Sequence, residues 1–135
     1  MNATPRQRYM TRMMIAMVAY GISIVAAGIA IETRQAGAAL AFALAIVPGL
    51  AVTGMFYALG MYIIELKDEF MRMLLVRQQL IAMGFTMSLA ALWGFLEEFG
   101  QVEHIPGFWI VVLWAVGTLL GALSNRMSHG SWGPC

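Results

Sequence analysis

The sequence has little charge and almost no cysteine. Asp, Glu, Lys and Arg together make up 11% of the 135 residues, against about 25% in an average soluble protein. The formal net charge is +1, so the chain has no field of one sign that would attract nucleic acid or an acidic substrate. Cys135 is the only cysteine, which excludes an internal disulfide and the class of secreted disulfide scaffolds.

Apolar residues are in excess. They make up 61% of the chain, compared with about 45–50% in an average protein. A soluble domain of this size exposes too large a share of its residues to bury so many apolar side chains. The composition therefore predicts an integral membrane protein whose first partner is the lipid bilayer, and it excludes a disordered chain.

Four apolar stretches are long enough to cross a bilayer. About 20 apolar residues in a helix span ~30 Å of hydrocarbon, and a helix pairs its own backbone groups inside lipid. We therefore predict an all-α fold, a polytopic four-transmembrane-helix bundle that forms a single integral membrane domain over residues 1–135. The predicted helices cover residues 13–31, 36–64, 80–96 and 106–123.

Polar segments and local signals mark the predicted boundaries. Residues 65–79 are predicted to form a cytoplasmic polar hairpin, and residues 124–135 a frayed tail. Thr4 followed by Pro5 is typical of an N-cap and first helical position, so the first helix is expected to begin well before the lipid. If the third helix starts at Asp68, it reaches about Phe99.

The second stretch contains Pro48. Proline lacks an N–H and clashes with the preceding turn, so we predict a kink between Leu44 and Gly49. Pro106 and Gly107 favour the start of the fourth helix at that point.

The distribution of cations predicts the orientation. With the N-terminus in the cytoplasm, only Arg34 lies outside, which fits the positive-inside rule. The topology is therefore predicted as N-in, C-in, in the inner (plasma) membrane of a bacterial-type cell. The alternative for the first stretch is a signal peptide cleaved near Ala36, although the uncharged run exceeds the usual apolar core of about 7–15 residues. The cations placed inside are Arg6, Arg8, Arg12, Lys67, Arg72, Arg77 and Arg126.

The densest polar stretch runs from Glu65 to Arg72. Asp68 is a candidate N-cap for the third helix, and Glu69 suits its first turn. Glu69 and Arg72 are three residues apart and can pair on one helix face. The stretch predicts either an ion-pair cluster of Glu65, Asp68, Glu69 and Arg72 that gates or docks a partner, or a polar turn whose charges fix the topology.

The run from Asp68 to Arg72 also carries a resemblance. Asp68-Glu69-Phe70-Met71-Arg72, followed by an apolar helix with Gly84 and a terminal Glu97, resembles small four-helix bacterial inner-membrane proteins of unknown function. The similarity covers about a third of the chain. It implies a membrane fold but no activity, cofactor or site residue.

The apolar stretches contain no ionisable residue near their centres, which argues against transport through the chain. Their hydroxyl groups are expected to bond backbone carbonyls or neighbouring helices. His104 and His129 fall in a loop and a tail, so neither suits an axial haem ligand at depth, and the scattered methionines are expected to pack. We predict no catalytic residue, no cofactor and no metal.

The sequence contains clearer signals for helix packing, from small residues at helical spacing, than for catalysis or ligand binding. Gly117-Thr-Leu-Leu-Gly121 is a GxxxG run, which lets helix backbones approach in lipid. It predicts closure of the bundle within one chain, or contact with a homo-oligomer or larger membrane complex. The predicted function is a non-catalytic structural or accessory subunit that acts through helix packing. The alternative is a small oligomeric transporter or channel gated by the charge cluster.

Overall fold

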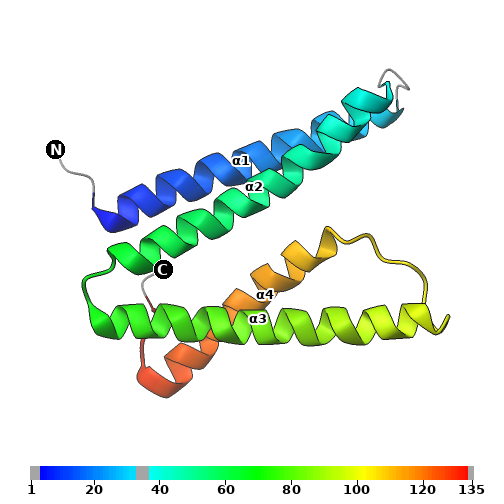
Figure 1. Cartoon of the computed structure of the whole chain (residues 1–135). Helices are drawn as coiled ribbons and strands as arrows, with labels where there is room; N and C mark the ends of the chain where they lie inside the picture. The colour runs from blue at the N-terminus through cyan, green and yellow to red at the C-terminus, as the bar shows by residue number, and fades with distance from the viewer. Residues whose placement is uncertain (1–3, 33–36, 134–135) are drawn as a thin grey trace. The chain divides into compact units, whose positions relative to one another are not determined.

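A computed structural model describes residues 4–32 and 37–133, and the regular structure in these ranges is entirely helical. The helices are α1 (Pro5–Glu32), α2 (Ala38–Glu65), α3 (Glu69–Glu98) and α4 (Trp109–His129) (Figure 1). Each of the four is long and apolar enough to cross a membrane, so the all-α prediction is confirmed. Arg34, Cys135, the predicted helix start at Ala36 and the alternative cleavage site beside it lie outside the described residues.

α1 begins at Pro5, as the Thr4–Pro5 pair predicted. The Thr4 hydroxyl accepts a hydrogen bond from the Gln7 N–H at 3.3 Å, and the Gln7 side-chain oxygen accepts one from the Thr4 N–H at 2.9 Å. This reciprocal arrangement is a capping box, which satisfies donors that the first turn leaves free. The helix therefore starts two turns before the apolar stretch at residue 13.

The predicted extent of the polar hairpin, residues 65–79, is wrong. Only residues 66–68 separate α2 from α3, and residues 69–79 are the first turns of α3. The Asp68 carboxylate accepts from the N–H groups of Phe70 and Met71, at 2.9 and 3.2 Å, so its predicted role as N-cap is confirmed. Hydropathy locates the start of the apolar run, at residue 80, whereas capping locates the start of the helix, at residue 69, about three turns earlier.

The boundaries of the fourth helix also differ from the prediction. α4 starts at Trp109 rather than at Pro106, and it continues to His129, so the first half of the tail predicted to fray is helical. The helix stops at Gly130, which has a left-handed backbone conformation with φ of +68°. Its N–H donates a hydrogen bond to the carbonyl of Arg126 at 2.9 Å. A left-handed residue at this position suits glycine, which has no Cβ to clash.

The chain divides into two compact units, each of which is a helical hairpin. The first unit, Met1–Leu66, contains α1 and α2, and the second, Lys67–Cys135, contains α3 and α4. Each hairpin is described by itself below. The single domain, the closed four-helix bundle and the N-in, C-in topology stay predictions.

In the first hairpin, the buried positions follow a seven-residue repeat. This spacing is typical of helices that coil gently around each other, and Figure 1 shows α1 and α2 side by side along their lengths. The Tyr9 and Tyr62 rings extend the repeat, since they stack with centroids 4.5 Å apart. The residues of this repeat are Ala16 and Ser23 in α1 and Ala51, Met55, Ala58 and Tyr62 in α2, and Leu59, next to the repeat, is buried as well.

In the second hairpin, the buried positions follow a four-residue repeat instead. Facing positions run in opposite directions, so that Gly117 meets Ala82 and Gly121 meets Gln78. Packing the i±4 ridges of two helices together makes them cross obliquely, and α4 crosses α3 in this way in Figure 1. The residues of this repeat are Leu74, Gln78, Ala82 and Thr86 in α3 and Gly117, Gly121 and Asn125 in α4, and Leu75, next to the repeat, is buried as well.

Candidate functional site

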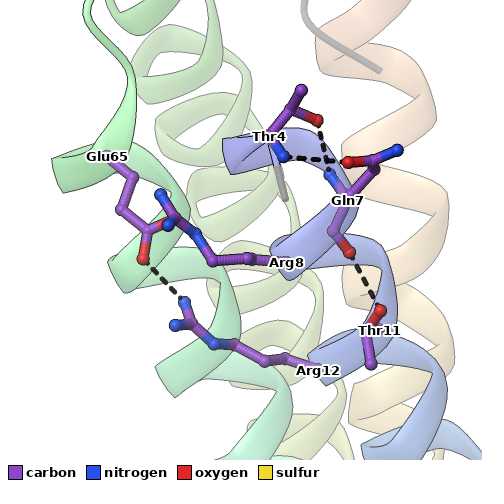
Figure 2. Close-up of polar contacts among 6 residues, drawn as sticks. All are labelled: Thr4, Gln7, Arg8, Thr11, Arg12 and Glu65. Carbon is purple, nitrogen blue, oxygen red and sulfur yellow. Dashed lines mark hydrogen bonds and ion pairs between the residues drawn. The ribbon is translucent and has the colours of Figure 1, made fainter. Parts of the chain in front are cut away.

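Glu65, the last residue of α2, is held by two arginines of α1 (Figure 2). Its Oε2 lies 2.9 Å from Arg8 Nε, and its Oε1 lies 3.0 Å from Arg12 Nη1. Arg8 and Arg12 are four residues apart, so both side chains leave the same face of α1. The sequence had grouped Glu65 with Asp68, Glu69 and Arg72 and did not predict these two ion pairs.

The Arg8–Glu65–Arg12 triad closes the end of the first hairpin at which the chain enters α1. Only 15% of the Glu65 side chain is exposed, and the Tyr9–Tyr62 stack lies beside the triad, one residue from Arg8 and three from Glu65. Two guanidinium groups on one carboxylate fix the register of α1 against α2. The geometry is that of a structural clamp within the hairpin.

The other three residues of the predicted cluster lie at the start of α3. Asp68 caps the helix, and Glu69 contacts Arg72 one turn later, at 3.6 Å between Oε1 and Nη2. The Glu69 side chain is 88% exposed, and exposed pairs of this kind contribute little to stability. These contacts give all three residues a structural role at the start of α3. A gating or docking role for them stays a prediction.

Gly117 and Gly121 lie at the closest approach of α3 and α4. A Cβ built on Gly117 would lie 2.8 Å from the Ala82 Cα, and one built on Gly121 would lie 2.6 Å from the Gln78 carbonyl oxygen. Real Cβ atoms do not approach backbone so closely, so both positions need glycine. The GxxxG run of α4 therefore packs against α3 of the same hairpin.

Two buried amides that the sequence analysis missed reinforce this crossing. Asn125 Nδ2 donates to the Leu74 carbonyl at 2.8 Å, and Gln78 Nε2 donates to the Thr118 carbonyl at 3.0 Å. Asn125 is completely buried. A signal existed, because Asn125 follows Gly117 and Gly121 at the same spacing of four and so belongs to the same helix face.

Arg77 forms a second polar group on the α3–α4 hairpin. Its Nη2 donates to the hydroxyls of Ser124 and Ser128, each at 3.2 Å, and its Nη1 lies 2.8 Å from His129 Nδ1. Nearby on α4, the Arg126 guanidinium lies over the Trp132 ring at 4.8 Å. The sequence analysis had counted Arg77 only among the cations on the cytoplasmic side.

An apolar groove of about 690 Å³ lies between the end of α3 and the start of α4. Its walls include Trp93, Trp109 and Ile110, and Glu97 is its charged lining residue. Glu97 Oε1 lies 2.5 Å from His104 Nδ1, so the loop histidine contacts this carboxylate. Such walls suit hydrocarbon rather than a polar substrate.

Hydroxyl groups within the helices bond their own backbone, as the sequence predicted. Ser23, Thr53, Thr86 and Thr118 each donate to a carbonyl three or four residues earlier, at 2.7–3.1 Å. Among the residues that the structure describes, no group of three or more His, Cys, Asp or Glu side chains could hold a metal ion.

No family model, no curated protein and no solved structure matches this chain. The resemblance to bacterial inner-membrane proteins therefore stays a prediction. The functional argument depends on the helices and on the contacts described above.

Proposed function

We propose that the chain is a multi-pass protein of the bacterial inner membrane that spans the bilayer four times, with both termini in the cytoplasm. The outward faces of the helices support insertion. Ile15 and Ile22 on α1, Phe42 on α2 and Leu119 on α4 are all 65–70% exposed. Exposing these apolar faces to water is unfavourable, whereas lipid tails solvate them.

The positions of the charges support the same proposal. In α1, α3 and α4 every charged residue falls within about three turns of a helix end, and the only charge in α2 is its last residue, Glu65. The middle of each helix, which would lie in hydrocarbon, therefore needs no buried charge. The cations cluster at the ends that the proposed topology puts in the cytoplasm.

We propose further that the protein has a non-catalytic role as a structural or accessory subunit and acts through helix packing. The observation that carries this proposal is that several small positions remain open. A Cβ built on Gly21 or Gly28 of α1, or on Gly84 or Gly94 of α3, would have no other atom within 4 Å. In lipid, open small residues let a second helix approach closely.

Photo-crosslinking in the membrane tests this role. A photoreactive residue at Gly84 or Gly94 should give adducts heavier than the monomer, and mass spectrometry would identify the partner. The matched control is the same residue at Leu119, which is exposed but is a large residue in the wild type. A second copy with a different tag separates a homo-oligomer from a larger complex. Adducts equally abundant at all three positions, or absent from all, would refute the packing role.

Insertion and topology have separate tests. Alkaline extraction should leave the protein in the membrane fraction, and a reporter fused after Ser131 should show a cytoplasmic signal. The transporter alternative has less support, because Asp68, Glu69 and Arg72 are accounted for by the start of α3. It requires a flux in reconstituted vesicles that Glu69→Gln or Arg72→Gln reduces.

A further inference from the structure

Arg77 is a half-buried cation without a carboxylate partner. In the described part of the chain, three cationic side chains are half-buried: Arg12, Arg72 and Arg77. Arg12 contacts Glu65 and Arg72 contacts Glu69. The partners of Arg77 are two hydroxyls and a histidine ring, none of which carries a negative charge. Removing a charge from water without a counter-charge is costly. An anion bound to this guanidinium would therefore be stabilising.

Within the second hairpin, no carboxylate contacts Arg77 among the described residues. α4 contains no Asp or Glu, while its last two turns contribute Arg126 and His129. On α3 the nearest carboxylate in sequence is Glu69, two turns away, which already contacts Arg72. Ser124 and Ser128 accept from Arg77 and keep their own O–H groups to donate. The group therefore offers an anion the positive charge, the two guanidinium N–H groups that these contacts leave free, and two hydroxyl donors.

An apolar surface adjoins this group. A shallow groove of about 500 Å³ on α3 is lined by Arg77 together with Met73, Val76 and Leu80, and also by Glu69 and Arg72. Its three apolar side chains are exposed. A guanidinium and hydroxyl groups are the donors that phosphate oxygens accept from. A ligand with a phosphate head and a hydrocarbon chain would satisfy both surfaces at once.

We propose that Arg77, Ser124 and Ser128 bind the phosphate of an anionic membrane phospholipid, with one acyl chain along Met73, Val76 and Leu80. The site rests on the proposed membrane insertion, which would put Arg77 at the cytoplasmic headgroup level, where anionic lipids attract basic side chains. A zwitterionic phospholipid binds less well, because its added cation has no free carboxylate to meet beside Arg77.

Native mass spectrometry of the full chain tests the site. The protein, released from detergent, is incubated with equal amounts of phosphatidylglycerol and phosphatidylcholine with identical chains. The wild type should retain phosphatidylglycerol preferentially, and Arg77→Gln should reduce that retention about fivefold. The matched control, Arg6→Gln, removes the same charge from an exposed arginine of the other hairpin and should change retention less than twofold.

Ser124→Ala/Ser128→Ala provides an independent variant, because it keeps the guanidinium and removes only the hydroxyls. It should lower phosphatidylglycerol retention at least twofold. Wild-type retention in either this variant or Arg77→Gln overturns the proposal, and so does an equal loss in Arg6→Gln. Excess inorganic phosphate should not displace the lipid, and complete displacement would mean that the site binds free phosphate instead.

Alkaline extraction of the same protein separates this proposal from the one it rests on. A chain that stays in the membrane fraction but shows no preference for phosphatidylglycerol refutes the lipid site alone. A chain that leaves the membrane fraction refutes membrane insertion.

Discussion

The two hairpins join their helices in different ways. α1 and α2 pack through side-chain contacts along a seven-residue repeat. The ion pairs of Glu65 with Arg8 and Arg12 join the two helices at one end. α3 and α4 pack along a four-residue repeat of small residues and amides that brings the backbones themselves together. The spacing of small residues, more than composition, thus decides whether two apolar helices run alongside or cross.

The difference has a measurable consequence for added volume. In the first hairpin, a Cβ on Gly54 would meet only the Ala16 Cβ, at an ordinary contact distance of 3.6 Å. In the second, a Cβ on Gly121 would meet the Gln78 carbonyl oxygen at 2.6 Å. The first contact needs no movement, because it is at an ordinary van der Waals distance, whereas the second requires the backbone of α3 or α4 to shift.

The largest expected effect comes from Gly121→Ala. The new methyl group has to push α3 and α4 apart, and overpacking of this kind costs about 1–3 kcal/mol. Gly54→Ala is the matched control and should stay within about 0.5 kcal/mol of the wild type. The free energy of unfolding of each variant can be measured by denaturant titration in mild detergent. Equal losses in the two variants would remove the proposed distinction between the hairpins.

Asn125→Ala should have the next largest effect. It removes the hydrogen bond to the Leu74 carbonyl and leaves a small void at a completely buried position. Interhelical hydrogen bonds in membrane proteins contribute about 1 kcal/mol, and we expect a loss of that order in the same titration. Thr53→Ala, which removes a bond within one helix only, should have almost no effect. A larger loss in Thr53→Ala than in Asn125→Ala would contradict the role of the amide.

The features that the sequence predicted well depend on neighbouring residues. The cap at Asp68, the capping residue Thr4 and the hydroxyl groups bonded within their own helices all involve partners two to four positions away. Helix geometry alone fixes such contacts. The GxxxG run could be recognised in the same way, because its two glycines necessarily share one face.

The features that the sequence did not predict depend on the register between helices. Glu65 lies 53 residues from Arg12, and Asn125 lies 51 from Leu74, so nothing local indicates either contact. The helix ends were misplaced for a different reason. Apolar runs mark only the apolar part of a helix, whereas capping by Thr4 and Asp68 starts α1 and α3 before their apolar runs begin.

Asp68→Ala sharpens the comparison at the link between the hairpins. Loss of an N-cap costs about 0.5–2 kcal/mol, and the loss should be confined to α3, whose first free N–H groups Asp68 satisfies. Hydrogen exchange should increase at Phe70 and Met71 and stay unchanged in α1 and α2. Asp68→Asn keeps an acceptor and should behave like the wild type. Faster exchange in α2 would show that the link supports both hairpins.

Glu65→Gln should have the smallest effect, and one confined to the first hairpin. The change removes the negative charge that Arg8 and Arg12 share, so the open end of α1 and α2 should exchange hydrogen faster around residues 5–12 and 62–65. Because these side chains are partly exposed, high salt should screen the pairs and shrink the difference from the wild type. Glu98→Gln, the same change at an exposed position of α3, is the control. Faster exchange at the α3–α4 crossing in Glu65→Gln would mean that the two hairpins do not depend on separate contacts, because the clamp would then stabilise both.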